Sequence, residues 1–502
     1  MIDSLQKWWN ELVPWFTHES FVNLWVYQKE NPMLFNSGMF LGFFLVFYFV
    51  YILTRKTHHF RITYVVLFSL FFYYKSSGLF FLLIIFSSIL DFVIGKLIYE
   101  EEKKSYRKFF LLVSLVTNLG LLGYFKYTNF FIDNWNIISN GRINFQEIIL
   151  PVGISFYTFQ TLSYTIDIYR KQLQPTKSFM DFLFYVSYFP QLVAGPIVRA
   201  SDFIPQIYKK LSITKDDVNL ALWLIIGGLI KKAVISDYIS INFVDRVFDN
   251  PTQYTSFENL MASYGYAIQI YCDFSGYSDM AIGLALLMGF TLPPNFRTPY
   301  QSASITEFWR RWHISLSSWL RDYLYISLGG NRKGKVRTYI NLFLTMLLGG
   351  LWHGANWKFV FWGGMHGMAL AVERVFNSKL SIPKNKPIRI VQMVLTFHFV
   401  VFCWLFFRAK DFTTAFQMAD LISQLQLNVD QWYILSMGYF NVFLLIVVGV
   451  VWHFIPNQWM ATWQQLFNQT PGWGKAVILA WVYWLVFATA SSGPQPFIYF
   501  QF

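Results

Sequence analysis

Two stretches between Ser304 and Gly367 decide how the chain is interpreted: SITEFWRRWHISLSSWLRDYLYISLGGNRKG (304–334) and NLFLTMLLGGLWHGANWKFVFWGGMHG (341–367). They contain three of the eight histidines, His313, His353 and His366. In both, an otherwise apolar sequence becomes rich in Arg, Trp and Gly. This combination makes the two stretches the candidate functional site.

The first stretch has the pattern of a helix that lies in a membrane interface. Ser304 followed by Glu307 fits a capping box, which begins a helix, and Gly329 and Gly330 end it. A basic face lies opposite an aromatic face, as in interfacial helices. The aromatic face consists of residues three or four positions apart: Trp309, Trp312, His313, Leu316, Trp319, Leu320 and Tyr323.

The second stretch is almost wholly apolar and is predicted to be embedded in the membrane, with His353 inside it. An ionisable side chain in such a segment is a functional candidate by default, and His353 is a candidate general base. A hydrogen-bonded core histidine is the alternative interpretation, and the residues alone leave both open. The glycine pairs Gly350/Gly354 and Gly363/Gly367 predict a close approach of helices or a bend of the backbone.

Composition places the chain in the membrane. Of its 502 residues, 55% are hydrophobic and only 13% are charged, whereas about a quarter are charged in soluble proteins. Several apolar runs reach the roughly 20 residues that a spanning helix needs, and others are shorter, which predicts broken or re-entrant helices. We therefore predict an all-α polytopic membrane protein.

Several function classes are disfavoured. Two cysteines, Cys272 and Cys403, provide neither a disulfide framework nor a metal-ligand cluster, and no metal is predicted. The sequence contains no HExxH, Walker A or GxSxG motif. We attribute the net charge of +13 to Lys and Arg residues in cytoplasmic loops rather than to a nucleic-acid-binding surface.

The chain is predicted to have one domain, 33–502, after a polar, Trp-rich N-terminal extension, 1–32, that is expected to be interfacial. Basic residues at 55–61, 103–108, 170–177 and 231–232 are predicted to be cytoplasmic by the positive-inside rule. Between Arg297 and Arg337 eight Lys/Arg stand against two acids, a balance of +6, so this stretch is expected to face the cytoplasm as well. Asp273, Ser275 and Asp279 are predicted to belong to a polar network between helices. Asp91 is expected to be solvated or capping.

A family resemblance is carried by WRRWHISLSSWLRDYLYISLGGNRKG, LLGGLWHGANW and FWGGMHG, which resemble the membrane-bound O-acyltransferase (MBOAT) family. Within that family they are most similar to the branch that O-acetylates alginate and other polysaccharides. The resemblance covers nearly the whole chain from about Met33 and includes further matching segments: PVGISFYTFQTLSYTIDIYR (151–170), FPQLVAGPIVR (189–199), YCDFSGYSDMAIG (271–283), NFRTPY (295–300), CWLFFRAKDF (403–412) and FIYFQF (497–502).

The resemblance implies a helical disc with broken helices and a central catalytic tunnel. It implies that His353 and His313 are catalytic, with His366, Trp352 and Asn356 as supporting residues. Acetyl-CoA is the implied acyl donor, and no permanently bound cofactor is expected. Its phosphates would meet a basic rim, for which contacts with lipid headgroups are the competing role: Arg310, Arg311, Arg332, Lys333, Lys335 and Arg337.

The implied activity moves an acetyl group across a bacterial inner membrane to an extracytoplasmic polysaccharide, with an SGNH-like partner protein and membrane lipid as partners and without nucleic acid. Two related activities stay open: D-alanyl transfer to teichoic acid from a carrier protein, and O-acetylation of peptidoglycan or a lipid. A secondary transporter is the alternative from another class, because intramembrane His and Asp residues also suit a solute path. The polysaccharide and the oligomeric state are not predicted.

Overall fold

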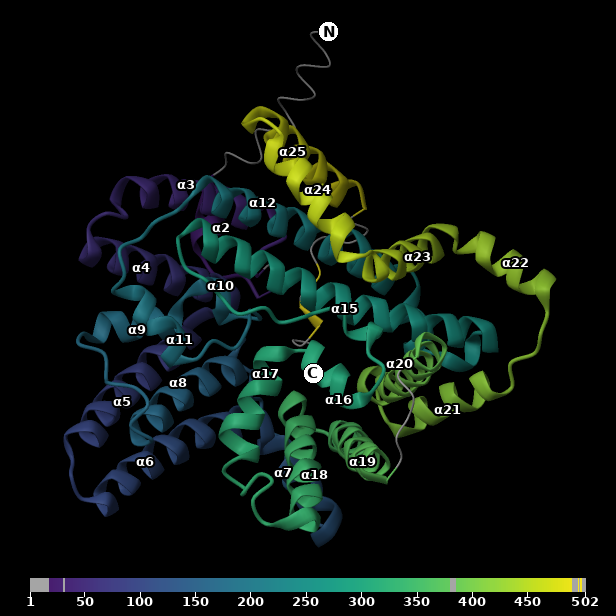
Figure 1. The fold of residues 1–502 in the computed structure, drawn as a ribbon, viewed down its shortest axis with the longest axis horizontal. Coiled ribbons are helices and arrows are strands. Elements are labelled where there is room, and N and C mark those ends of the chain that lie inside the picture. The colour runs from purple at the N-terminus through teal and green to yellow at the C-terminus, as the bar shows by residue number, and fades with distance from the viewer. Residues whose placement is uncertain (1–17, 30–31, 380–384, 490–494, 496, 499–502) are drawn as a thin grey trace. The chain divides into compact units, whose positions relative to one another are not determined.

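A computed structural model describes the whole chain except residues 1–17, 30–31, 380–384, 490–494, 496 and 499–502 (Figure 1). In the described residues every regular element is a helix, which confirms the all-α prediction. The predicted extension 1–32 lies partly outside these residues. Its described part forms α2 (His18–Trp25), and its interfacial role stays a prediction.

Five described helical stretches are long and apolar enough to cross a membrane: His58–Glu100, Lys104–Ser139, Lys215–Asp249, Lys386–Arg408 and Gly472–Thr489. A further pair, α22 (Val429–Gly438) and α23 (Phe440–Phe454), passes the same test together but bends by 93° between its halves. The chain is therefore a multi-pass membrane protein, and its bent pair is a broken span or a re-entrant loop.

The described residues fall into two compact units, and the single-domain prediction for 33–502 is not tested by this division. The first unit comprises the described part of 1–121 together with 149–193 and 199–211. Besides α2, its helices are α3 (Gly38–Thr54), α4 (His58–Ser77), η2 (Gly78–Phe80), α5 (Phe81–Glu100), α6 (Lys104–Leu122), α8 (Ile154–Tyr169), α9 (Phe179–Ser187), α10 (Phe189–Leu192) and α11 (Ala200–Ile207).

Aromatic packing organises the first unit. The ring of Phe189, at the start of α10, lies 5.8 Å from the rings of Phe47 and Phe72. Just before it, Tyr188 separates α9 from α10, so this apolar segment is a broken helix, as the short apolar runs predicted.

The position of Asp91 corrects the prediction that this residue is solvated or caps a helix. It is fully buried, and its carboxylate accepts hydrogen bonds from Ser114 at 2.6 Å and Asn118 at 2.9 Å, because a buried carboxyl needs hydrogen-bond partners in place of water.

The second unit comprises 122–148, 194–198 and the described part of 212–502, and it contains every candidate site residue. Its helices are η3 (Gly123–Tyr127), α7 (Thr128–Ser139), α12 (Lys215–Leu229), η4 (Ile230–Ser236), α13 (Asp237–Ile239), η5 (Ser240–Val244), α14 (Asp245–Asp249), η6 (Pro251–Gln253), α15 (Ser256–Leu287), η7 (Pro299–Gln301), α16 (Ile305–Arg311), α17 (Ile314–Trp319), η8 (Leu320–Tyr325), α18 (Gly334–His353), α19 (Trp357–Lys379), α20 (Lys386–Arg408), α21 (Phe412–Ser423), α22, α23, α24 (Asn457–Gln469) and α25 (Gly472–Thr489).

Helices α12 and α15 pack backbone to backbone, and two lysines at their contact correct the charge prediction. A Cβ on Gly228 would stand 2.6 Å from the carbonyl oxygen of Gly276, so both positions require glycine. Lys231 and Lys232, expected in a cytoplasmic loop, are instead buried in the π-helical segment η4. Lys231 pairs with Asp279, and Lys232 pairs with Asp237 and Asp273. Buried charges need such partners, and the predicted network at Asp273 and Asp279 is confirmed.

Candidate active site

The stretch that carries His313 is broken, which corrects the prediction of one continuous helix. Helix α16 ends at Arg311, and α17 begins at Ile314. Between them Trp312 is extended and His313 has φ 43° and ψ 54°, in the left-handed region. The aromatic face is buried in the protein rather than laid on lipid, because Trp312 and Leu316 are each only 1% exposed.

Asn295 holds this break in place. Its backbone carbonyl accepts the Ile314 N–H at 2.9 Å, and its side-chain Oδ1 accepts the Ser315 hydroxyl at 2.9 Å. His313 Nδ1 lies 3.1 Å from the same Oδ1. Because an amide oxygen only accepts, Nδ1 carries the hydrogen, and Nε2 of the neutral ring keeps its lone pair. A left-handed non-glycine residue costs about 1–3 kcal/mol, which these contacts offset.

His353 is the last residue of α18, and Gly354 continues in an extended conformation. The last carbonyls of any helix lack partners within the helix. Here two residues of η3 supply them: Tyr127 Oη donates to the Leu351 carbonyl at 2.8 Å, and Lys126 Nζ donates to those of Trp352 and His353 at 2.7 and 2.9 Å.

Helices α18 and α19 lie side by side (Figure 1) and touch through glycine, as the glycine pairs predicted. A Cβ on Gly350 would stand 2.2 Å from the Phe359 carbonyl oxygen, and one on Gly363 would stand 2.3 Å from that of Met346. This contact fixes the helix that ends at His353 against the helix that carries His366.

The Gly363→Ala variant is expected to lower the thermal unfolding midpoint by several degrees, because the methyl group pushes α19 away from α18. The matched control is Gly364→Ala, whose Cβ would meet nothing closer than 3.9 Å. Unfolding followed in detergent checks this, and equal midpoints for the two variants would contradict the close contact.

Tryptophan rings connect the three histidines, all of which are at least 97% buried. The Trp352 ring lies 6.3 Å from His313 and 5.0 Å from His353. The Trp362 ring lies 5.2 Å from His353 and 4.9 Å from His366. The structure therefore brings His313, His353 and His366 into one aromatic cluster, although the first and the last of them are 53 residues apart along the chain.

The protonation of His366 follows from its neighbour. Trp309 Nε1 donates to His366 Nδ1 at 3.3 Å, so the hydrogen of the neutral His366 ring is on Nε2. That Nε2, together with Nε1 of Trp362 and Nε1 of Trp404, has no acceptor among the described residues, although all three atoms are buried. The rings of Trp362 and Trp404 stack at 5.7 Å. Buried N–H groups without acceptors are rare, and here they belong to Trp362, which packs against His353, and to the two rings in contact with Trp362.

The two supporting candidates differ. Trp352 is buried between His313 and His353 and belongs to the cluster. Asn356 is exposed, and its side chain accepts the Lys358 N–H at 3.0 Å, which shapes the turn before α19. Asn356 therefore positions the turn rather than contributing a side chain to the cluster.

The basic candidates fall into two groups. Arg310 and Arg311 lie at the end of α16, two or three residues from His313. The others lie on the exposed turn before α18 and on its first turn, at the end of that helix opposite to His353: Arg332, Lys333, Lys335 and Arg337. At 1.5 Å per residue, the 19 steps from Gly334 to His353 measure about 28 Å. A donor held at this turn must therefore extend along α18 to reach His353.

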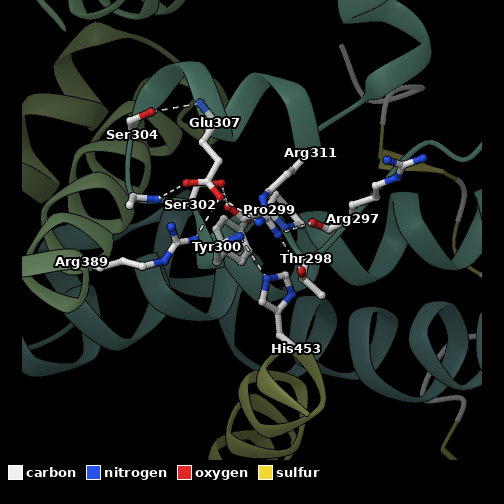
Figure 2. Close-up of polar contacts among 11 residues, drawn as sticks. Arg297, Thr298, Pro299, Tyr300, Ser302, Ser304, Glu307, Arg311, Arg389 and His453 are labelled. Atoms are coloured by element: carbon white, nitrogen blue, oxygen red, sulfur yellow. Dashed lines mark hydrogen bonds and ion pairs between the residues drawn. The ribbon is translucent and has the colours of Figure 1, made fainter. Parts of the chain in front are cut away.

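Glu307 joins the start of α16 to two arginines (Figure 2). Its N–H donates to Ser304 Oγ at 3.1 Å, as the capping box predicts, but its carboxylate accepts the Ala303 N–H rather than that of Ser304. The carboxylate also pairs with Arg311 at 2.8 Å and Arg389 at 3.2 Å. Although burial alone would raise the pKa of Glu307, the Ala303 N–H and the two arginines hold this pKa below its ordinary value of 4.5.

The Glu307→Gln variant is expected to be less stable than the native chain at pH 7 by about 1 kcal/mol. A carboxyl with a lowered folded-state pKa stabilises the fold above its unfolded pKa and loses this contribution as the pH falls through the folded pKa. The difference in unfolding midpoint should therefore shrink below pH 4.5, the ordinary pKa. Thermal unfolding between pH 7 and pH 3 measures it, and a pH-independent difference would refute the ion-pair origin.

Sequence reasoning missed Lys126, Tyr127, Asn295, Trp362 and Trp404. Lys126 carried a usable signal, since it is an isolated cation in the apolar run LLGYFKYTNFF (121–131). Asn295 opens the segment NFRTPY but resembles any loop asparagine. Its role depends on contacts across 18 to 20 residues, which the sequence does not display.

Comparison with known proteins identifies the family. The sequence model of the membrane-bound O-acyltransferase family matches residues 170–412. A peptidoglycan O-acetyltransferase of Helicobacter pylori is 38% identical over 416 residues, which cover 77% of this chain and 79% of that protein. The chain therefore belongs to the membrane-bound O-acyltransferase family.

Two further relatives have names that describe different activities. A probable alginate O-acetylase AlgI of Pseudomonas putida is 48% identical over 314 residues, 61% of this chain and 63% of that protein. The matched part thus spans less than two thirds of this relative's length. A teichoic acid D-alanyltransferase of Bacillus subtilis is 30% identical over 282 residues, 53% of this chain and 71% of that protein.

Proposed function

We propose that this protein is a membrane O-acetyltransferase of a bacterial inner membrane that moves an acetyl group from acetyl-CoA to a hydroxyl of an extracytoplasmic polysaccharide. The observation that carries the proposal is the cluster in which Trp352 and Trp362 connect His313, His353 and His366. Each histidine comes from a different element, and none is exposed by more than 3%. A buried set of imidazoles in a membrane protein supports proton-transfer chemistry.

His353 is the proposed general base. One of its ring nitrogens takes the proton of the acceptor hydroxyl while the hydroxyl oxygen forms a bond with the thioester carbonyl carbon. The resulting oxyanion collapses, the carbon–sulfur bond breaks, and the proton passes to the leaving thiolate. This sequence yields an ester and free CoA with atoms and charge balanced.

The oxyanion requires hydrogen-bond donors that are in place before the reaction. His366 Nε2–H and the indole N–H groups of Trp362 and Trp404 are the proposed donors, because they are buried without an acceptor among the described residues, in the cluster that contains His353. His313, with its lone pair on Nε2, is proposed to orient the acceptor hydroxyl.

The acetyl group and the polysaccharide are chosen over the alternatives by likeness. The relative named as an alginate O-acetylase is 48% identical and the one named as a D-alanyltransferase is 30% identical. Acetyl-CoA as donor, the basic residues near its phosphates and an SGNH-like partner protein belong to this proposal through the family resemblance. Of the basic residues, Arg310 is the better placed phosphate contact, since it lies at the end of α16, three residues before His313.

The test uses the purified full chain in lipid vesicles with acetyl-CoA labelled in the acetyl group, with and without a soluble alginate oligosaccharide. We expect release of free CoA and transfer of label to the oligosaccharide. A parallel reaction contains D-alanine bound to a carrier protein, and we expect no transfer from it.

Two outcomes would overturn the assignment. Transfer of D-alanine but not of acetyl would move the protein to the teichoic acid branch. Uptake of a solute or of protons without thioester consumption would make it a transporter. A third reaction contains soluble peptidoglycan fragments as the acceptor. If label reaches these fragments but not alginate, the protein remains an O-acetyltransferase and its acceptor is peptidoglycan.

A further inference from the structure

An open apolar groove of about 560 Å³ lies on the second unit, and the proposed reaction does not use it. Helices α15, α20 and α23 form its walls, which are almost wholly apolar. Its representative lining residues are Ile268, Ile390, Val394, Phe397, Ile446 and Val450. The groove is thus shaped for a ligand with a long apolar part.

The groove opens onto the surface that α20 and α23 present to the membrane. Helix α20 is a candidate membrane span, and α23 is half of the bent pair. Within the groove Ile390 is 60% exposed, Val394 49% and Phe454 46%. Apolar side chains this exposed on a spanning helix indicate lipid rather than water as their surroundings.

The length of the groove matches one leaflet. Along α20 its lining runs from Ile390 to His398, eight steps of 1.5 Å or about 12 Å. The hydrocarbon core of a bilayer is about 30 Å thick, so one leaflet contributes about 15 Å. An acyl chain that enters at the start of α20 would therefore fill the groove and end near its far wall.

Cations gather at that end of the groove (Figure 2). Arg389 immediately precedes the lining residue Ile390 and is 53% exposed. Arg311 donates to the Arg297 carbonyl and to the Thr298 hydroxyl, both at 3.2 Å, just before Tyr300, which also lines the groove.

The local charge is positive. Glu307 pairs with both Arg389 and Arg311, and Arg297 is exposed. A second carboxylate, that of Glu373, accepts the Thr306 N–H at 3.0 Å, and a further exposed cation, Lys386, begins α20. Four cations against two carboxylates leave a balance of +2 beside the groove. Guanidinium groups in this arrangement favour a phosphate, which accepts several charge-assisted hydrogen bonds at once.

We propose that this groove binds an anionic glycerophospholipid, with an acyl chain between α15, α20 and α23 and the phosphate headgroup on Arg389 and Arg311. The site goes beyond the proposed acetyl transfer and does not depend on it. The lipid would pack against α15, α20 and α23 and would hold Arg297–Tyr300 ahead of α16.

The experiment is native mass spectrometry of the purified full chain, delipidated in mild detergent and titrated with phosphatidylglycerol or with phosphatidylcholine of the same chains. We expect phosphatidylglycerol to bind about tenfold more tightly, because only its headgroup is anionic. Val394→Trp, which fills the groove, should lower binding of both lipids at least about tenfold. The control is Val391→Trp, since Val391 is 57% exposed on the same helix and does not line the groove.

The headgroup is tested separately. Arg389→Gln should remove the preference for phosphatidylglycerol and leave binding of phosphatidylcholine unchanged. Lys410→Gln, beyond the opposite end of α20, should keep the native preference. Each variant is first checked for a native unfolding midpoint.

Three results would overturn the proposal. Native-like lipid binding by Val394→Trp would show that the groove is not the lipid site. Equal binding of the two lipids by the native chain would show that the site has no preference for an anionic headgroup. A native chain that is dimeric at all lipid concentrations, and monomeric only as Val394→Trp, would make a second copy the occupant.

Discussion

Replacing His353 by glutamine is expected to lower kcat for acetyl transfer by about 10²–10⁴-fold, with KM changed by no more than about threefold. The glutamine amide keeps polar atoms near the imidazole position but cannot accept a proton at neutral pH. It therefore removes the general base while the aromatic surroundings, Trp352 at 5.0 Å and Trp362 at 5.2 Å, stay in place. Single-turnover and steady-state transfer from labelled acetyl-CoA measure the effect.

His59→Gln is the matched control, because His59 is exposed in the first unit, which contains none of the candidate histidines. It should retain the native kcat and KM. His313→Gln is informative in its own right, since Asn295 leaves a lone pair on Nε2 of that ring. If His353→Gln transfers at the native rate and His313→Gln does not, the base is His313, and the assignment to His353 is wrong.

The sequence predicted well those structural features that depend on local composition and on the spacing of nearby residues. Apolar runs predicted a multi-pass helical protein, and glycine pairs four residues apart predicted the close contact of Gly350 with α19. Short apolar runs predicted broken helices, and the segment around Tyr188 is one of them. These properties depend on neighbouring residues, so periodicity and residue type were sufficient.

The features that sequence missed depend on partners far along the chain. The aromatic spacing of 309–323 fits one helix, but Asn295 binds the backbone and side chains at His313–Ser315 and stabilises a break there. By the positive-inside rule, Lys231 and Lys232 predict a cytoplasmic loop. In the structure they are buried, and carboxylates on α15, more than 40 residues away along the chain, neutralise their charges. Positive-inside counting has no means of separating a paired lysine from a solvated one.

Lys126→Met is expected to lower kcat about 100-fold with little change in KM, because it leaves the carbonyls of Trp352 and His353 without their donor. A buried carbonyl left without a partner costs about 1–3 kcal/mol, so the last turn of α18 should open more often. Hydrogen–deuterium exchange of residues 344–353 should therefore become faster. Lys126→Arg, which retains a charged donor, should recover part of the activity and of the protection.

Lys75→Met is the matched control for this effect. Lys75 Nζ donates to two carbonyls at the end of α2, those of Asn23 at 3.0 Å and Val26 at 2.5 Å, so the substitution removes the same kind of contact in the first unit. It should lower stability and leave kcat and the exchange of 344–353 as in the native chain. Native exchange in Lys126→Met would refute the positioning of α18 by Lys126. Faster exchange with an unchanged kcat would instead show that catalysis does not need a fixed His353, because a base that acts in the rate-limiting step tolerates little displacement.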